Sequence, residues 1–174
     1  YSSCSFSLKL RSIICIDESG YDLDVIGLSS GKVIKRFKNP YKNANKLNQY
    51  ILLNRNNTIL FEYKRNGNSR KINIWDLNTK KILYTLKGHD KSIKTIKFSP
   101  DGLSLSSASK DSLIKIWDLQ TGQLKQTIKA KEKNITGMEY FPDSIKLAIS
   151  FKNQSIEIWN TNTGELINEY DNSY

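Results

Sequence analysis

Residues 88–123 read GHDKSIKTIKFSPDGLSLSSASKDSLIKIWDLQTGQ. Two turn signals divide this stretch, Pro100-Asp101-Gly102 and Thr121-Gly122, which place proline and glycine where β-turns favour them. Short runs rich in β-forming or alternating residues surround these turns, at 92–99, 103–109, 113–119 and 123–128. The spacing predicts four short antiparallel strands within about 42 residues.

The same pattern recurs along the chain. Trp75, Trp117 and Trp159 stand 42 residues apart. The three aligned segments are KINIWDLNTKKILYTL at 71–86, LIKIWDLQTGQLKQTI at 113–128 and SIEIWNTNTGELINEY at 155–170. A weaker copy, DLDVIGLSSGKVIKRF at 22–37, has Ile26 at the Trp position. An internal period of this length is typical of propeller blades.

The repeat predicts an all-β fold, a β-propeller of about four four-stranded antiparallel blades. The predicted blades cover about 1–40, which is degenerate, 48–87, 88–130 and 131–172. The other strands are predicted at 4–8, 11–16, 24–28, 33–37, 50–53, 59–63, 71–76, 82–86, 135–141, 145–150, 155–160 and 165–170. Because a blade buries both faces against its neighbours, we expect the segment 1–174 to associate with itself or to need further blades.

The composition is that of a globular protein, with 38% hydrophobic and 10% aromatic residues in 174. No apolar run approaches the ~20 residues of a membrane span. The first residues lack a basic start followed by an apolar run, so we do not expect a signal peptide there. One disulfide between Cys4 and Cys15 is conceivable, but we expect reduced, buried thiols and therefore an intracellular, cytoplasmic protein.

These residues identify a family resemblance. The segment 88–123 resembles a WD repeat in its Gly-His start, its Phe-Ser-Pro-Asp-Gly turn, the Asp six residues before the Trp, and its Trp-Asp end. The neighbouring repeats resemble it in period and in the Trp. The resemblance implies a ring of about seven blades, of which this chain is a part.

The resemblance also implies a buried hydrogen-bond relay. Its members here are Trp117 as an indole donor, Ser107 or Ser109 as the receiving hydroxyl, and His89 as a bridge to Asp111. A hydrolase triad would use the same residue types, but the resemblance assigns them a structural role. Only this blade keeps the relay, because Lys131 and Asn153 stand one period after His89 and Asp111. We expect apolar packing to hold the other blades, around the blade-core residues Trp75 and Trp159.

Catalytic and cofactor motifs are absent from the sequence. It has no phosphate-binding glycine loop and no nucleophile elbow. One His and two distant Cys do not make a zinc site. The acidic residues Asp17, Glu18, Asp22 and Asp24 lack the pattern of a calcium loop, so we expect a solvated turn. The sequence therefore predicts no enzyme activity, no cofactor and no metal.

Three functions remain open. The first is a non-catalytic scaffold or sensor that binds proteins, with partners docking on loops at one end of the blades, as the resemblance implies. Those positions hold Ser92, Lys94, Lys110, Asn134, Thr136 and Lys152. Three of the six are lysines, which predicts an acidic protein or peptide as partner and salt-sensitive binding. The second is the accessory propeller tail of a signalling ATPase or kinase. The third is a surface for nucleic acid or anionic lipid, favoured by the net charge of +10.

Overall fold

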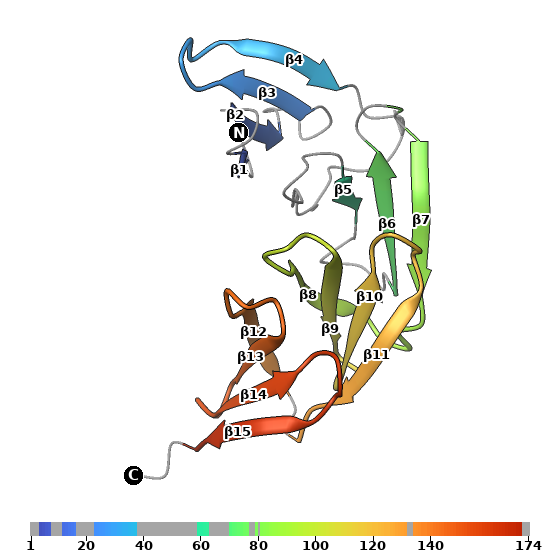
Figure 1. Cartoon of the computed structure of the whole chain (residues 1–174). Coiled ribbons are helices and arrows are strands. Elements are labelled where there is room, and N and C mark those ends of the chain that lie inside the picture. Colours follow the sequence, from blue (N-terminus) through green and yellow to red (C-terminus); the bar gives the residue numbers. More distant parts are fainter. Residues whose placement is uncertain are drawn as a thin grey trace. The chain divides into compact units, whose positions relative to one another are not determined.

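The computed structural model describes residues 4–7, 12–16, 23–37, 59–62, 70–76, 79, 81–131 and 134–171. All regular secondary structure in this part of the chain is β-strand (Figure 1). The strands form antiparallel sheets in which sequence neighbours pair, three sheets with four strands and one with three. The predicted all-β fold of blade-like sheets is confirmed. No helix among these residues is long and apolar enough to cross a membrane.

The sheets follow one another along the sequence. The first contains β1 (Cys4–Ser7), β2 (Ser12–Ile16), β3 (Leu23–Gly27) and β4 (Val33–Phe37). The second contains β5 (Ile59–Glu62), β6 (Lys71–Asp76) and β7 (Lys81–Lys87). The third contains β8 (Ile93–Phe98), β9 (Ser104–Ser109), β10 (Leu113–Asp118) and β11 (Leu124–Lys129). The last contains β12 (Ile135–Tyr140), β13 (Lys146–Phe151), β14 (Ile156–Asn160) and β15 (Leu166–Tyr170).

Most of these strand ends lie one residue from the predicted ends, and the others coincide with them. The strand predicted at 50–53 lies outside the described residues, so the second sheet is described with three strands. The blade boundaries and the number of blades in a ring stay predictions.

The turns explain why the repeat folds the same way twice. After β10, the Asp118 carboxylate accepts the backbone N–H groups of Gln120 and Thr121 over 2.8 and 2.9 Å. After β14, Asn160 Oδ1 accepts the N–H groups two and three residues on, over 2.9 and 3.1 Å. Each turn closes on a glycine, Gly122 with φ 72° and Gly164 with φ 74°. Glycine is favoured here because its φ is positive.

The structure divides into two compact units, one of residues 1–66 and 73–84, the other of 67–72 and 85–174. The second unit contains the third and last sheets, which pack face to face. Their shared core joins Ile114, Ile116 and Ile128 to Leu147 and Ile149, all at most 1% exposed. This face-to-face packing is what the repeat predicts for neighbouring blades.

A buried polar contact also joins these two sheets. Tyr140 Oη lies 2.5 Å from Ser106 Oγ. Burial raises the pKa of the Tyr140 phenol to about 12, because the charged form is disfavoured away from water. Tyr140 therefore stays a neutral hydrogen-bonding group at any physiological pH.

The cysteine prediction is wrong. Cys15 is buried in β2 and disulfide-bonded. Cys4 is the other cysteine of the sequence and stands directly opposite Cys15 in the β1–β2 register. Residues facing each other across an antiparallel pair have Cβ atoms close enough for a disulfide, a proximity that only the register reveals. The predicted intracellular location rested partly on reduced thiols, and it stays a prediction.

Candidate functional site: a buried relay and an exposed loop face

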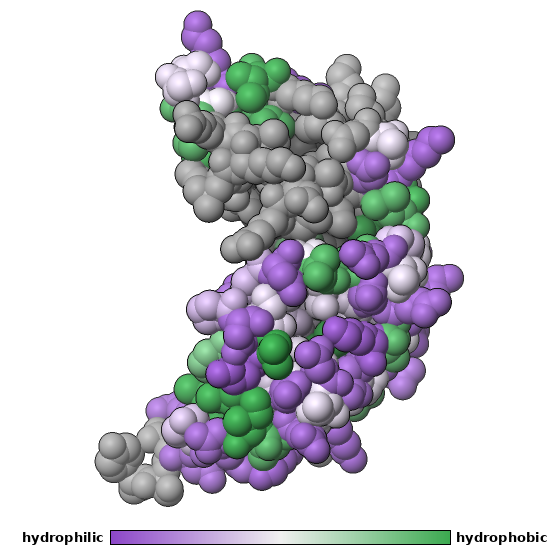
Figure 2. All heavy atoms as spheres, viewed as in Figure 1, coloured by the Kyte–Doolittle hydropathy of each residue, from purple (hydrophilic) through white to green (hydrophobic). Residues whose placement is uncertain are grey.

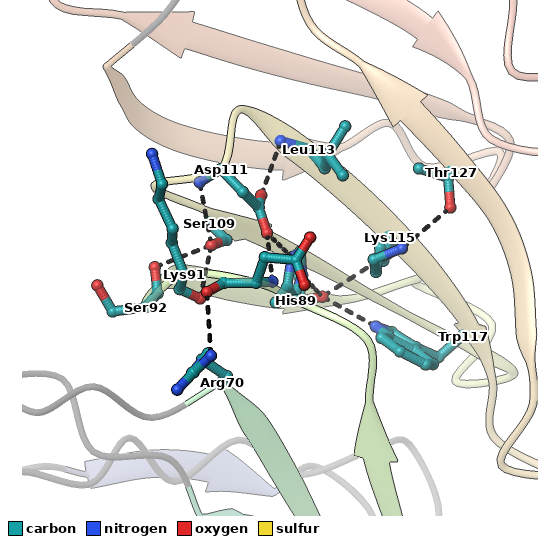
Figure 3. Close-up of polar contacts among 12 residues, drawn as sticks. Arg70, His89, Lys91, Ser92, Ser109, Asp111, Leu113, Lys115, Trp117 and Thr127 are labelled. Carbon is teal, nitrogen blue, oxygen red and sulfur yellow. Dashed lines mark hydrogen bonds and ion pairs between the residues drawn. The ribbon is translucent and has the colours of Figure 1, made fainter.

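Four side chains of the second unit form a continuous chain of hydrogen bonds (Figure 3). The Trp117 indole N–H donates to Ser107 Oγ over 2.8 Å. Ser107 Oγ lies 2.8 Å from His89 Nε2, and His89 Nδ1 lies 2.9 Å from Asp111 Oδ2. The structure thus brings the relay residues together in the order that the resemblance implies.

Ser107, and not Ser109, receives the Trp117 indole. Ser109 Oγ instead lies 2.9 Å from the carbonyl of Lys91 and 3.0 Å from that of Ser92. Its hydroxyl therefore holds the loop that precedes β8. Asp111 binds the same loop, because its Oδ2 accepts the backbone N–H of Asp90 over 3.1 Å.

Gly88 precedes the relay histidine in a backbone conformation that favours glycine. Its φ is +152°, and a Cβ at this position would lie 3.4 Å from Trp117 Cη2 and 3.5 Å from Lys115 Cε. Both contacts are ordinary van der Waals distances, so conformation rather than space favours glycine here. The Gly-His pair thereby brings His89 into the sheet beside Trp117.

One tautomer of neutral His89 satisfies every member of the relay. With the proton on Nδ1, His89 donates to Asp111 and accepts the Ser107 hydroxyl at Nε2, while Ser107 accepts the Trp117 N–H. Burial lowers the pKa of His89, and this outweighs the opposing effect of Asp111. Burial opposes ionisation of Asp111, but hydrogen bonds from the Leu113 N–H and from His89 prevail and lower its pKa.

The relay has the connectivity of a catalytic triad but not its accessibility. Asp111, His89 and Ser107 are linked as an acid, a base and a nucleophile would be. Ser107 is 0% exposed and His89 is 4% exposed, and the Ser107 oxygen already accepts the indole N–H. A substrate carbonyl cannot approach Ser107 Oγ, so this geometry supports a structural role.

The buried His89 should make the stability of the fold depend on pH. Since the folded pKa of His89 lies below the unfolded value of about 6.5, the unfolded chain binds more protons near and below that pH. We expect the free energy of unfolding to fall as the pH drops from 7 to 5.5. His89 is the single histidine of the chain, so urea denaturation of His89→Gln should show a much flatter profile in this window. If the free energy of unfolding of His89→Gln fell with pH as steeply as that of the wild type, His89 would not be the group responsible.

The last sheet satisfies its tryptophan with a different residue, which the sequence prediction missed. Glu157 Oε2 accepts the Trp159 indole N–H over 2.7 Å, and its Oε1 accepts the backbone N–H of Lys131 over 3.1 Å. Lys131 stands at the position equivalent to His89, and Ile149 at that of Ser107. Apolar packing holds this sheet against the preceding one, as expected. A fully buried carboxylate, which the sequence did not predict, also links Trp159 to the entering loop.

The first sheet also carries a buried acid on the strand of its Trp-equivalent residue. Asp24 lies two residues before Ile26, as Glu157 lies two before Trp159. Arg36 Nε and Nη2 donate to the two Asp24 carboxylate oxygens over 2.5 and 2.7 Å. The expectation of a solvated turn is wrong for Asp24, which is 1% exposed; Asp17, Glu18 and Asp22 lie outside the described residues. The strand of Trp75 is described, but its side chain is not.

The predicted partner residues lie at equivalent positions of two packed sheets. The Lys110 N–H donates to the Ser92 carbonyl over 3.0 Å, and the Lys152 N–H donates to the Asn134 carbonyl over 3.1 Å. These two bonds are one repeat apart, so each joins a β-turn to the loop before its own sheet. We call the six residues the loop face: Ser92, Lys94, Lys110, Asn134, Thr136 and Lys152. Five are exposed and Ser92 is partly buried.

Two turns with the same backbone shape support the loop face. Ser112 has φ 66° and Gln154 has φ 68°, again one repeat apart. The N–H of each donates back to the third residue before it, over 3.2 Å to Ser109 and 3.0 Å to Phe151. The lysines that precede these residues, Lys110 and Lys152, are therefore presented on rigid turns of matching geometry.

The part of the chain that the structure describes holds no group of three or more His, Cys, Asp or Glu side chains that could bind a metal. The buried carboxylates of Asp111 and Glu157 are already engaged by protein N–H donors. The arrangement therefore offers an exposed surface for recognition above buried structural groups.

Comparison with known families supports the resemblance found in the sequence. Residues 80–118 match the model of the WD domain, G-beta repeat, a family also called WD40. The matched segment runs from β7 to β10, so it includes the last strand of one sheet, the first three strands of the next and the whole relay.

Proposed function

Because residues 80–118 match the WD domain, G-beta repeat model, we propose that this chain is a non-catalytic scaffold that binds an acidic protein or peptide on its loop face. A WD repeat supports a role in protein interaction in general. Our proposal adds the acidic chemistry of the partner and the place where it binds, the loop face.

The observation that carries this proposal is the recurrence of the two loop bonds. The bonds from Lys110 to Ser92 and from Lys152 to Asn134 hold equivalent loops on two sheets that pack together. Rigid strands that hold exposed loops in a fixed arrangement are a common basis for recognition sites. The buried relay holds one of these loops through Asp111, and the Ser109 hydroxyl holds the same loop.

The chemistry of the loop face favours an acidic partner. The ammonium groups of Lys110 and Lys152 form no ion pair with a described carboxylate, whereas Lys97 and Lys146 are paired with Glu139 and Asp143. Lys110 and Lys152 are therefore available to carboxylates of another molecule. The chain's net charge of +10 would speed the approach of such a partner, and salt would weaken it.

We expect the double variant Lys110→Gln/Lys152→Gln to bind an acidic peptide about 5- to 30-fold more weakly than the wild type, because two exposed ion pairs contribute roughly 1–2 kcal/mol together. The measurement is fluorescence anisotropy with a labelled Glu- and Asp-rich peptide, at low and at physiological salt. The same titration with duplex DNA tests the nucleic-acid alternative.

The matched control is Lys81→Gln/Lys125→Gln, which removes the same charge from exposed positions outside the loop face. We expect this control to bind the peptide nearly as the wild type does. Equal weakening in both double variants would mean that net charge alone governs binding. Tighter binding to DNA than to the peptide would favour a nucleic-acid surface and reject the proposal.

A further inference from the structure

The second unit has another set of repeated turns, at the end opposite the loop face. The turn 99–103 joins β8 to β9, and the turn 141–145 joins β12 to β13 one period later. Because β8 and β12 begin at the loop face and run away from it, these turns lie at the far ends of the two sheets. The backbone N–H of Asp101 in the first turn donates to Ser144 Oγ in the second over 3.0 Å. The two turns therefore lie side by side.

Each turn holds one apolar residue on a fixed backbone, Leu103 in the first and Ile145 in the second. The N–H of each donates to the aspartate two residues before it, over 2.9 Å in both turns. The carbonyl of each accepts the N–H of the first residue after β10 or β14, over 2.9 and 2.8 Å. Both backbone polar groups of each residue are thus satisfied within the unit, and the positions of the two side chains are fixed.

The side chains of these residues remain exposed to solvent, Leu103 by 50% and Ile145 by 41%. Beside them, Pro142 is exposed and Phe141 is partly buried. Figure 2 shows such hydrophobic atoms, in green, among hydrophilic ones on the surface of the second unit. An apolar side chain on a rigid backbone loses little conformational freedom when a partner covers it, which favours binding. We call Asp101, Leu103, Phe141, Pro142, Asp143 and Ile145 the turn face.

The charge of this end is opposite in sign to that of the loop face. Its four turns, at 99–103, 119–123, 141–145 and 161–165, contain three acidic residues and no Lys or Arg: Asp101, Asp143 and Glu165. Hydrogen bonds from two backbone N–H groups, those of Lys146 and Ile145, lower the pKa of Asp143, so it is ionised at neutral pH. Lys146 Nζ pairs with Asp143 over 3.1 Å, whereas Asp101 forms no ion pair with a described residue. The Asp101 carboxylate therefore lies beside an exposed apolar surface without a cation of its own.

We propose that the turn face binds a segment of a partner protein in which basic side chains alternate with apolar ones. The apolar side chains of the segment cover Leu103 and Ile145, and a lysine or arginine pairs with Asp101. Charge complementarity selects this occupant, because an acidic segment meets like charges at this end. Binding at the turn face does not require the acidic partner of the loop face, so the two proposals stand or fall separately.

The test is fluorescence anisotropy with a labelled peptide of alternating lysine and leucine residues, titrated with the full chain at physiological salt. A peptide of alternating lysine and serine residues probes charge alone. The net charge of +10 repels both peptides, so binding requires a local site. We expect the wild type to bind the lysine–leucine peptide and Leu103→Ser/Ile145→Ser to bind it about 10-fold or more weakly, because the apolar contacts are lost.

A second variant tests the charge separately. Asp101→Asn keeps an oxygen that accepts the Leu103 N–H, so the turn is preserved while the carboxylate charge is removed. We expect it to weaken binding of the lysine–leucine peptide about 2- to 5-fold and to reduce its dependence on salt.

The matched control is Leu83→Ser/Ile156→Ser, which replaces residues that are 45% and 40% exposed and lie outside the turn face. We expect this control to bind the lysine–leucine peptide as the wild type does, with circular dichroism showing that every variant is folded. The proposal is overturned by a wild type that does not bind at about 1 mM, by equal weakening in the control, or by equally tight binding of the lysine–serine peptide. Self-association of the chain that Leu103→Ser/Ile145→Ser abolishes would also overturn it, because a second copy would then occupy the face.

Discussion

Glu157→Ala is expected to lower the free energy of unfolding by about 3–5 kcal/mol, the largest loss among the single substitutions considered. Glu157 is 0% exposed and accepts the N–H groups of Trp159 and Lys131. The substitution leaves both donors without an acceptor and opens a cavity beside the tryptophan. Urea denaturation followed by circular dichroism measures the effect.

Two further variants separate the charge from the volume of Glu157. Glu157→Gln keeps the shape but has one acceptor oxygen for two donors, so we expect it to remain clearly less stable than the wild type. Glu165→Ala removes an exposed carboxylate just before β15 and should cost less than about 0.5 kcal/mol. A Glu157→Ala protein within about 1 kcal/mol of the wild type would contradict the assigned role.

Ser107→Ala is expected to cost about 2–4 kcal/mol. The substitution removes one oxygen, yet it leaves both the Trp117 indole N–H and the acceptor nitrogen of His89 without a partner in a buried site. The matched control is Ser104→Ala in the same strand, whose hydroxyl forms no hydrogen bond with the described residues. We expect this control to change the free energy of unfolding by less than about 0.5 kcal/mol.

A double-mutant cycle tests whether the relay acts as one unit. Once His89 is replaced by Ala, the further loss from Ser107→Ala should be smaller than in the wild-type background, because one of its two partners is already gone. Strictly additive losses in Ser107→Ala/His89→Ala would mean that the two side chains contribute independently. The relay would then be a set of neighbours rather than a network.

The strands could be predicted closely because turn residues recur at fixed distances from each Trp. Pro100-Asp101-Gly102 and the Gly122 turn bound the strands on both sides, and the period then transfers these bounds to the last sheet. The relay could be predicted only through the resemblance. Which of Ser107 and Ser109 accepts the Trp117 indole N–H depends on the β9–β10 register, which the sequence does not show. Trp117 pairs with Leu105, so Ser107 is two residues away and Ser109 is four, about 13 Å along the strand.

The buried acids could not be predicted, since charged residues in strands are usually exposed. Glu157 has the strand parity of Trp159, and this is the one signal in SIEIW that places it on the inner face. The alternation of side chains along the strand does not show whether a hydrogen-bond donor lies near Glu157. Lys131 supplies that donor from a loop, and Arg36 supplies it to Asp24 from the next strand, contacts that depend on the folded geometry. The Cys15 disulfide depends in the same way on the β1–β2 register.

Binding of an acidic partner at the loop face is tested most directly by a titration of the isotope-labelled chain with the acidic peptide, followed residue by residue in amide NMR spectra. If the loop face binds the peptide, the shift changes will be concentrated at Ser92, Lys94, Lys110, Asn134, Thr136 and Lys152 and reduced at higher salt, with the strand cores of β9 and β13 unchanged. Changes spread evenly over exposed lysines throughout the chain, or confined to residues outside the loop face, would contradict it.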